Sequence, residues 1–345
     1  MPDIKSSSEH IDIDWYRVPL DKQVLQDLNR RSDLKGLAQS VGFLALLALT
    51  GFLVLYSAGR GIWSWVLVPL FLIVHGSFFN FLLNGFHELC HGTVFATRWL
   101  NDVFLKIYSL LGWYSYVSFQ QSHRRHHRYT LHPPFDSEVV LPIKHSIKGF
   151  CKFAIINVRF RFNFRGFYRH ARGIILDPWQ QKLFPESKPE LRHQLIGWAR
   201  LTLLVHGMII IASILLGILV HPRWLLLPLV TTFARAFGQG LNFLLNETQH
   251  VGLSDNVPDF RLCARSIRVN PFFGFIYWQM QYHIEHHMYA AVPFYNLPRL
   301  NRLIRQQLPE PPNGVIATWR KIGWILARQK EDPAYTYKPS LPTTV

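Results

Sequence analysis

Apolar residues gather into long runs along this chain, and polar turns or basic segments separate the runs. A helix needs about 20 mostly apolar residues to cross the hydrocarbon core of a bilayer. Four runs reach that length, at residues 37–58, 62–85, 195–220 and 224–245. The pattern therefore predicts four transmembrane helices.

The four runs are arranged as two pairs. Only Gly59-Arg60-Gly61 separates the first two runs, and only His221-Pro222-Arg223 separates the last two. Connections this short join antiparallel neighbouring helices. We expect an all-α integral membrane protein whose four transmembrane helices form two hairpins.

The remaining segments predict a cap on one side of the membrane. Residues 99–119 are apolar but are interrupted by Lys106 and Gly112, which favours interfacial helices over a spanning helix. The predicted organisation has an N-terminal arm, a membrane domain whose histidine-rich cap has two parts, and a C-terminal tail. These regions are residues 1–36, 37–307 with the cap at 123–194 and 250–307, and 308–345.

The distribution of charged residues predicts on which side of the membrane this cap lies. The chain carries 37 Lys and Arg against 21 Asp and Glu, for a formal net charge of +16. The basic residues flank apolar runs instead of forming one stripe interleaved with aromatics, which argues against nucleic acid as a partner. Residues 123–192 hold 14 Lys or Arg, whereas each hairpin turn holds one Arg. The positive-inside rule then predicts that the cap and both termini are cytoplasmic, in a bacterial plasma membrane or the endoplasmic reticulum.

Three cysteines, Cys90, Cys151 and Cys263, are scattered along the chain. They are too few and too far apart in sequence for a disulfide framework or a Cys-x-x-Cys metal site. This usage agrees with a functional region in a reducing compartment.

Histidines carry the candidate chemistry, in clusters with helical spacing. Residues three and four apart share one face of an α-helix, so a His-x-x-His-His segment presents three imidazoles together. That spacing occurs twice, and shorter versions of it occur elsewhere. The clusters are His87 and His91; His123, His126 and His127; Asn246 and His250; and His283, His286 and His287.

The predicted hairpins bring all of these clusters to the cytoplasmic side. Nine imidazoles exceed what one first-row metal can bind, since a structural zinc takes about four ligands. Two metal ions fit the count. Imidazole suits iron, copper, zinc and nickel alike, so ligand type does not choose among them.

The boxes His-Glu-Leu-Cys-His, Ser-His-Arg-Arg-His-His and Tyr-His-Ile-Glu-His-His, with two hairpins between them, closely resemble those of the membrane fatty acid desaturase superfamily. Its members are integral-membrane, oxygen-dependent, non-haem di-iron enzymes. The pair Asn246 and His250 looks like a further ligand pair of these enzymes, in which the Asn acts through a water. The segment 293–299 also resembles their sequence, and the likeness covers about residues 62–300.

The resemblance implies two irons held by the nine histidines, with O2 as co-substrate and a lipid or fatty-acyl chain as substrate. It implies an oxidoreductase, in the first place a desaturase, with a hydroxylase on the same centre as the alternative. No fused haem, flavin or nicotinamide motif occurs, so the resemblance implies an external electron donor, a ferredoxin or cytochrome b5 with its reductase. His132, Asp136 and Glu138 follow the second box and could orient the ligand imidazoles.

Two other classes of protein fit part of the pattern. His87-Glu88-Leu89-Cys90-His91 matches the His-Glu-x-x-His motif of zinc proteases, with Glu88 as general base, but an intramembrane protease leaves the other clustered histidines unused. A non-enzymatic metal or haem carrier is the other alternative.

Arg235 stands out because a charge within an apolar run is costly in lipid. We expect it to face protein, water or a polar substrate group, so an acidic headgroup and a structural ion pair are both open. For His75 and His206, which lie in apolar runs outside the clusters, we expect hydrogen-bonded helix packing.

Overall fold

The computed structural model describes residues 11–342, and helices form all of its regular structure. Within that range no β-strand occurs, and only three isolated β-bridges are present. The expectation of an all-helical protein is met. Residues 1–10 of the predicted arm and 343–345 of the predicted tail lie outside the described residues.

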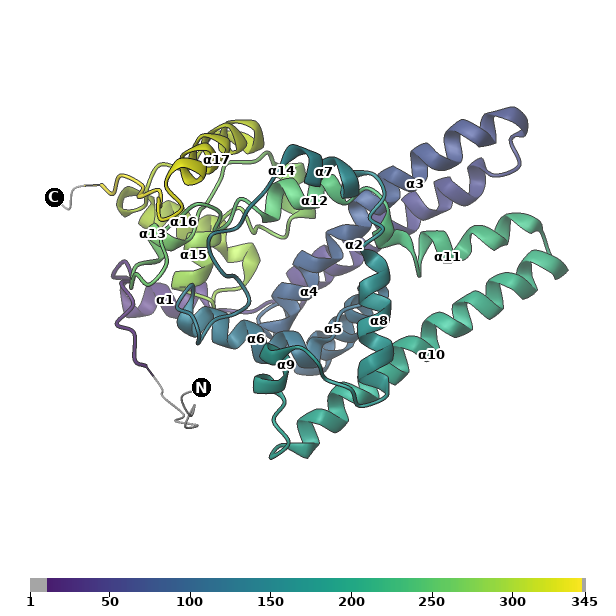
Figure 1. The fold of residues 1–345 in the computed structure, drawn as a ribbon, viewed down its shortest axis with the longest axis horizontal. Helices are drawn as coiled ribbons and strands as arrows, with labels where there is room; N and C mark the ends of the chain where they lie inside the picture. Colours follow the sequence, from purple (N-terminus) through teal and green to yellow (C-terminus); the bar gives the residue numbers. More distant parts are fainter. Residues whose placement is uncertain (1–10, 343–345) are drawn as a thin grey trace.

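Three helical stretches are long and apolar enough to cross a membrane, namely Asp33–Ser57, Gly61–Cys90 and Pro189–Leu219. The first is α2 (Asp33–Ser57). The second comprises η1 (Gly61–Trp63), α3 (Ser64–Asn80) and α4 (Leu82–Cys90), and the third is α10 (Pro189–Leu219). Figure 1 shows α2 beside α3, and both project from the rest of the molecule together with α10.

The prediction of one continuous helix over 224–245 is wrong. The chain instead forms four short pieces: η2 (Pro222–Leu226), α11 (Leu227–Val230), η3 (Ala234–Ala236) and α12 (Gln239–Asn246). Gly238 adopts a left-handed conformation with φ of 61°, and a Cβ there would lie 2.3 Å from the Ile73 carbonyl oxygen. Glycine alone fits such a position without strain, so the helix cannot continue through it.

Neighbouring helices satisfy backbone groups that this interruption frees. Trp113 Nε1 donates to the Thr232 carbonyl at 2.9 Å, and Asn80 Nδ2 donates to the Phe237 carbonyl at 2.9 Å. His75 Nε2 hydrogen-bonds the Val230 carbonyl at 2.9 Å. Irregular backbone is tolerated at membrane depth when protein supplies its partners in this way.

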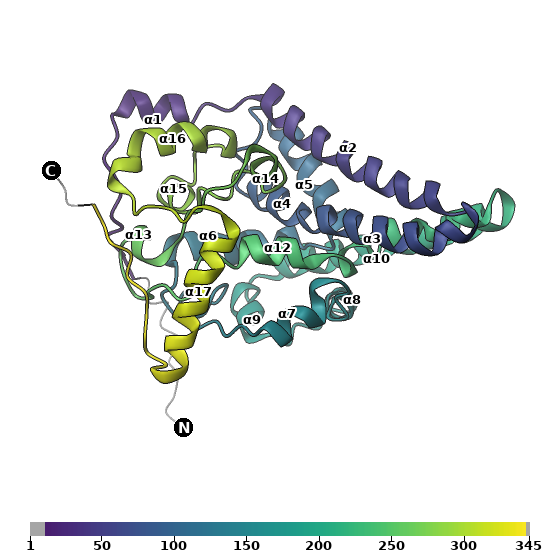
Figure 2. The same ribbon diagram turned by 90° about the horizontal axis from the view of Figure 1, so that it is seen from above.

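Two further helices, α5 (Arg98–Gly112) and α6 (Tyr116–Tyr129), follow α4 along the chain. The side chains of Tyr108, Tyr277 and Trp278 are fully buried where α4, α5 and the segment before α15 (His283–Met288) meet. Figure 2 shows α6 and α15 to the left of the long helices α2 and α3, with α4 between them, so the apolar helices and the histidine-bearing helices adjoin.

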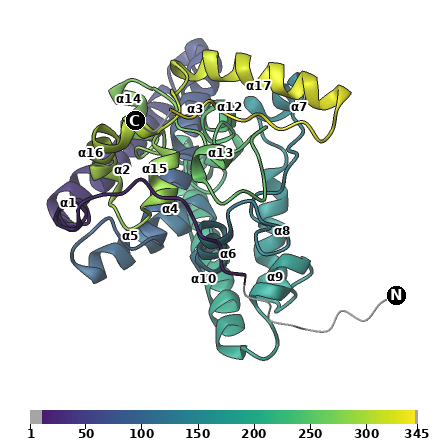
Figure 3. The ribbon, with the colours of Figure 1, turned by 90° about the vertical axis from the view of Figure 1, so that its left-hand side faces the viewer.

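The remaining helices surround this region. Figure 3 shows α6 near the centre of the molecule, with α17 crossing one side and α9 on the other. These helices are α1 (Lys22–Leu28), α7 (Ile147–Ala154), α8 (Phe160–Ala171), α9 (Pro178–Leu183), α13 (Phe260–Cys263), α14 (Pro271–Ile276), η4 (Phe294–Asn296), α16 (Leu297–Ile304), η5 (Arg305–Gln307) and α17 (Gly314–Glu331).

The terminal regions pack on the rest of the protein. Trp15 stacks on Phe260 with ring centroids 4.1 Å apart, and Arg17 Nε donates to the Met288 carbonyl at the end of α15. At the other end, Trp319 of α17 donates to the Leu244 carbonyl in α12 at 2.7 Å. Both predicted peripheral segments therefore contact elements that carry site residues.

The close packing of α4 predicts a marked effect of one methyl group. A Cβ at Gly85 would lie 2.4 Å from the Tyr108 ring and 2.6 Å from the Trp278 ring, and both rings are fully buried. We expect Gly85→Ala to destabilise the fold by about 1–3 kcal/mol, the usual cost of overpacking. A lower thermal unfolding midpoint of the detergent-solubilised protein checks this.

Gly207→Ala is the matched control, because it also adds a methyl group within an apolar helix. No atom lies within 4 Å of a Cβ at Gly207, and alanine is the better helix former. This variant should keep or raise the unfolding midpoint. Equal losses in both variants would contradict the packing argument.

Candidate metal centre

The nine clustered histidines converge in one buried region. α4 carries His87, and His91 follows its last residue as the C-cap. α6 carries one three-histidine box, and α15 carries the other. His250 lies in the turn that follows α12. The helical spacing of each box turns its imidazoles to one face, as the sequence indicates. Three separate helices and one turn thus supply a single cluster.

The imidazoles fall into two groups. The first group has five histidines whose nitrogen atoms all lie within 4.8 Å of one another, and the second has three. His283 adjoins the second group, since its Nε2 lies 2.9 Å from His250 Nε2 and 3.1 Å from His287 Nε2. The first group is His87, His91, His123, His127 and His286; the second is His126, His250 and His287.

Several of these Nε2 atoms face one another with lone pairs. His250 Nδ1 donates to the Cys263 carbonyl at 2.7 Å, so the Nε2 of the neutral ring has no proton. The same argument applies to His287. The Thr130 hydroxyl donates its proton to the His126 carbonyl, so the Thr130 oxygen accepts from His287 Nδ1 and the Nε2 of the neutral His287 ring has no proton. Lone pairs that converge in this way, here on His250 and His287, are donors that a metal ion can bind.

The first group repeats the arrangement. His123 Nδ1 donates to Glu138 at 2.7 Å, and His123 Nε2 lies 3.2 Å from His91 Nε2 and 3.0 Å from His127 Nε2. His286 is fully buried, and within the described residues neither of its nitrogens has a hydrogen-bond partner. Buried polar atoms without partners are rare, so the donor set fits metal ions well.

Carboxylates contact the Nδ1 atoms of three cluster imidazoles, on the side of each ring away from Nε2. Glu138 contacts His123, and Glu88 Oε1 lies 2.9 Å from His87 Nδ1. Asp136 accepts from His126 Nδ1 at 2.8 Å and from the Leu131 backbone N–H at 2.9 Å. Such partners fix the tautomer and the orientation of a ligand imidazole.

The third predicted orienting residue, His132, lies elsewhere. Its Nδ1 donates to the Thr130 carbonyl at 2.8 Å, and its ring packs edge-on against Trp15. Asp136 and Glu138 thus lie against cluster imidazoles, as an orienting role requires, whereas the observed contacts of His132 are with Thr130 and Trp15.

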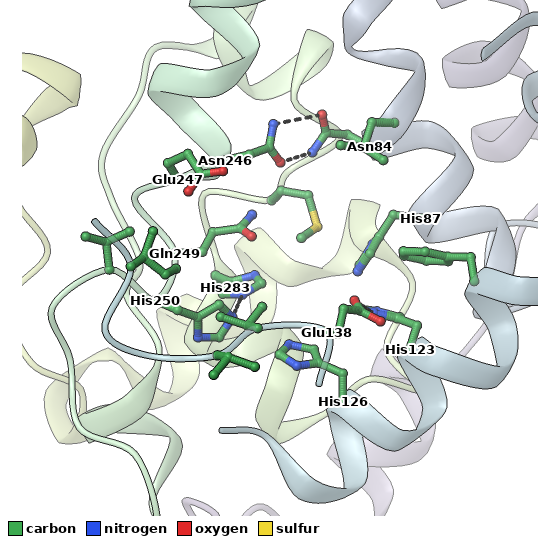
Figure 4. A pocket seen from close by; sticks show the side chains of 17 residues that line it. Asn84, His87, His123, His126, Glu138, Asn246, Glu247, Gln249, His250 and His283 are labelled. Atoms are coloured by element: carbon green, nitrogen blue, oxygen red, sulfur yellow. Dashed lines mark hydrogen bonds and ion pairs between the residues drawn. The ribbon is translucent and has the colours of Figure 1, made fainter. Parts of the chain in front are cut away.

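Asn246 lies beside the cluster but is paired with another amide. Its Oδ1 accepts from Asn84 Nδ2 at 2.8 Å, and its own Nδ2 donates to the Asn242 carbonyl at 3.0 Å. Figure 4 shows this pair at the top of the view and the imidazoles of His87 and His250 below it. Both asparagines line a cavity of about 320 Å³ that five cluster histidines also line.

Sequence reasoning missed three contributors to the site. Asn84 precedes His87 by three residues, so helical spacing alone could have placed it on the ligand face. Glu88 was considered only as a protease base, although here it contacts a neighbouring imidazole. The Cys263 carbonyl is a backbone group, and its role follows from tertiary packing alone.

Burial keeps most of the imidazoles neutral. Burial, with a smaller contribution from neighbouring imidazoles, lowers the pKa of His91 to about 3 and the pKa of His250 to about 3. Burial opposes charge on His126 as well, but the hydrogen bond to Asp136 outweighs it and raises the pKa of His126. Neutral imidazole is the form that binds metal, so the cluster is prepared for metal at neutral pH.

Arg235 lies outside the histidine groups. Its Nη1 donates to the Gly112 carbonyl at 2.6 Å, and its guanidinium lies 4.3 Å from the centre of the Tyr114 ring. No described carboxylate lies within ion-pair distance of it. The structural ion pair that the sequence left open is therefore not seen among residues 11–342.

Long apolar helices and two buried groups of imidazoles define a membrane protein with sites able to hold metal ions. A family model described as fatty acid desaturase matches residues 61–319, which is most of the chain. The chain therefore belongs to the fatty acid desaturase family. A comparison with curated proteins finds no match. Membership makes the protein an oxidoreductase that modifies lipids, and it confirms the resemblance read from the histidine boxes.

Removing the hydrogen bond between Glu138 and His123 Nδ1 should weaken metal binding. We expect Glu138→Ala to lower the affinity of the chain for iron about 10–100-fold, because His123 loses the acceptor that fixes its tautomer. Titration of the purified protein against a chromophoric chelator measures this. Glu190→Ala, at an exposed carboxylate in the first turn of α10, is the control and should bind iron as the parent does. An unchanged affinity in Glu138→Ala would contradict the orienting role.

Proposed function

We propose that the protein is an O2-dependent di-iron oxidase of a lipid or fatty-acyl chain and that its reaction is desaturation. The observation that carries this proposal is the pair of imidazole groups whose ring nitrogen atoms converge, several of them with a free lone pair. Membership of the fatty acid desaturase family, which generally uses two irons, supports the choice of metal.

The two groups divide the ligands between two irons. We assign the first iron to the five-histidine group and the second to the other four histidines, with Asn246 reaching it through a water. Bound there, the irons would supply an oxidant, formed with O2, that removes hydrogen from an unactivated C–H bond. The proposed ligands are His87, His91, His123, His127 and His286 for one iron, and His126, His250, His283 and His287 for the other.

The chain's own residues prepare this site. Asp136, Glu138 and the Cys263 carbonyl retain the Nδ1 protons, so the Nε2 lone pairs stay aimed at the metals. Apolar side chains cover one wall of the 320 Å³ cavity and give a hydrocarbon chain room next to the imidazoles. These apolar side chains are Leu83, Val139, Val140, Ile143 and Met280.

Whether the product is an alkene or an alcohol depends on how the chain is held. Removing a second hydrogen gives the alkene, whereas returning a hydroxyl group gives the alcohol. A small difference in the position of the reacting carbon decides between them. Hydroxylation on the same centre is thus the second candidate, and product analysis under 18-oxygen gas separates the two reactions.

Electrons for the reaction come from a separate protein, a ferredoxin or cytochrome b5 with its reductase. A cavity of about 480 Å³ is lined by His91, His123 and His127 together with the cationic Arg124. An acidic donor suits this basic surface. We place it, with the histidine groups and both termini, on the cytoplasmic side of a bacterial plasma membrane or the endoplasmic reticulum.

Metal analysis tests the proposal. We expect about two irons per chain without a haem absorption band. His286→Ala should lose most of its iron and its oxidase activity, because His286 is a fully buried member of the five-histidine group. Elemental analysis and mass spectrometry of lipids from cells with and without the gene provide the readouts.

His193→Ala is the matched control, because His193 is exposed at the start of α10 and lies outside both groups. It should keep its iron and its activity. One zinc per chain would favour the protease interpretation, and a haem spectrum would favour a carrier. Iron and activity that survive His286→Ala would overturn the di-iron assignment.

A further inference from the structure

A second cavity of about 480 Å³ adjoins the histidine cavity and has no role in the site described above. It is lined by Tyr114, which lies between α5 and α6, by Ser118 in the first turn of α6, by Phe162 and Phe167 of α8, and by Arg235. We call it the Arg235 cavity. Aromatic and polar side chains share its walls, and the polar ones include the cation of Arg235.

The protein supplies hydrogen-bond partners for only part of the Arg235 guanidinium. Nη1 uses the Gly112 carbonyl, and the Tyr114 ring covers one face. Nε is buried and has no hydrogen-bond partner within residues 11–342. Arg235 is half-buried, and a cation in such a place without a counter-charge is costly, so this arrangement favours an anion.

Tyr114 offers a second free donor to the same cavity. Its hydroxyl is buried and donates to no acceptor in the described part of the chain, while the Arg235 guanidinium lies close enough to donate to the hydroxyl oxygen. Its ring is held in place, because it stacks on Phe86 with centroids 4.7 Å apart. A fixed hydroxyl beside a guanidinium matches the several acceptor lone pairs of a carboxylate or phosphate.

The two carboxylates on the cavity wall are already engaged. Glu138 accepts from Ser122 and His123, and Asp177 accepts from the Gln180 backbone N–H at the start of α9. They therefore have established partners of their own, and neither lies within ion-pair distance of Arg235. The cation of Arg235 remains available to a ligand.

The Arg235 cavity reaches the proposed metal centre by way of two apolar side chains. Leu83 and Phe119 line both this cavity and the histidine cavity. Leu83 precedes His87 by four residues, about 6 Å of helix rise, and Phe119 precedes His123 by the same rise. The rings of Phe119 and His123 stack at 4.6 Å. A hydrocarbon chain that passes these two residues would arrive beside the imidazoles.

We propose that Arg235 and Tyr114 bind the anionic headgroup of a single-chain lipid, whose oxygen atoms accept hydrogen bonds from both residues. The chain of this lipid passes Leu83 and Phe119 to the histidines. The assignment of the lipid as substrate rests on the proposed oxidase function, whereas the headgroup preference rests on the Arg235 cavity alone. Arg235 and Tyr114 are then the residues that determine headgroup specificity.

Binding of three lipids with the same chain tests the proposal. The full chain, in nanodiscs of zwitterionic lipid at pH 8, is titrated with hexadecanoate, hexadecyl phosphate and hexadecanol, and dissociation constants are measured by thermophoresis. We expect at least one of the two anions to bind about tenfold more tightly than the alcohol, since hydrogen bonds to charged groups are the stronger ones. The anion that binds more tightly identifies the headgroup as carboxylate or phosphate.

Variants test which residues cause the preference for anionic lipids. Arg235→Gln should lose the tenfold preference for the anion and bind hexadecanol as before, and Tyr114→Phe should lose part of it. Arg235→Lys keeps the charge and should keep some preference, which guards against a variant that merely misfolds. Arg223→Gln, at an exposed arginine in the turn before α11, is the matched control and should bind all three lipids unchanged.

Equal affinity of the parent protein for alcohol and anions would overturn the proposal, as would a preference that survives Arg235→Gln. Iron content and product formation are measured on the same preparations. If those fail while the headgroup preference holds, the oxidase assignment is wrong and the binding site stands. If iron and product are present without a preference, only the headgroup inference falls.

Discussion

The structure depends on one electrostatic constraint, which is that nine imidazoles, seven of them buried and two half-buried, must converge in one cluster. Burial disfavours the protonated forms of His91 and His250, so these imidazoles stay neutral at neutral pH and each keeps one nitrogen lone pair. The arrangement sets two requirements: rings such as His123 and His250 are held by a hydrogen bond at Nδ1, and cations occupy the space in front of the cluster. Nδ1 of His127, His283 and His286 has no such partner among residues 11–342. The hydrogen-bond partners Asp136, Glu138 and the Cys263 carbonyl follow from the first requirement. The second is the physical reason for proposing two metal ions.

This constraint explains why packing around the cluster is so close. α4 must approach α5 and the segment before α15 until Gly85 touches two buried aromatic rings. Only then do boxes that are far apart in the sequence reach one another. α15 is held in turn by Glu285, which is fully buried and bonded to Ser266 and Asn301. The apolar core thus acts as the rigid support that fixes imidazole positions, and the terminal segments add contacts from outside.

Helical periodicity was sufficient to predict most of this arrangement from sequence. The spacing of His123, His126 and His127 specifies a shared helix face, and apolar runs specify three long helices. The rest depends on tertiary contacts that composition does not encode. The 224–245 run is apolar enough to look continuous, but Gly238 makes a left-handed turn against the Ile73 carbonyl, and local propensity cannot reveal that approach. The backbone acceptor at Cys263 is invisible in any side-chain pattern for the same reason.

The interruption of the last apolar run also has a consequence for chemistry. In a continuous helix a charged side chain would meet lipid or a neighbouring helix at a position set by the 3.6-residue repeat. Here Arg235 lies in η3, between two irregular turns, and its guanidinium reaches the Gly112 carbonyl and the Tyr114 ring at the junction of α5 and α6. That junction leads directly into the helix that carries His123. The departure from regular helix therefore brings a cation to the wall of a cavity next to the histidines. A regular fourth helix would have lacked the turns that place it there.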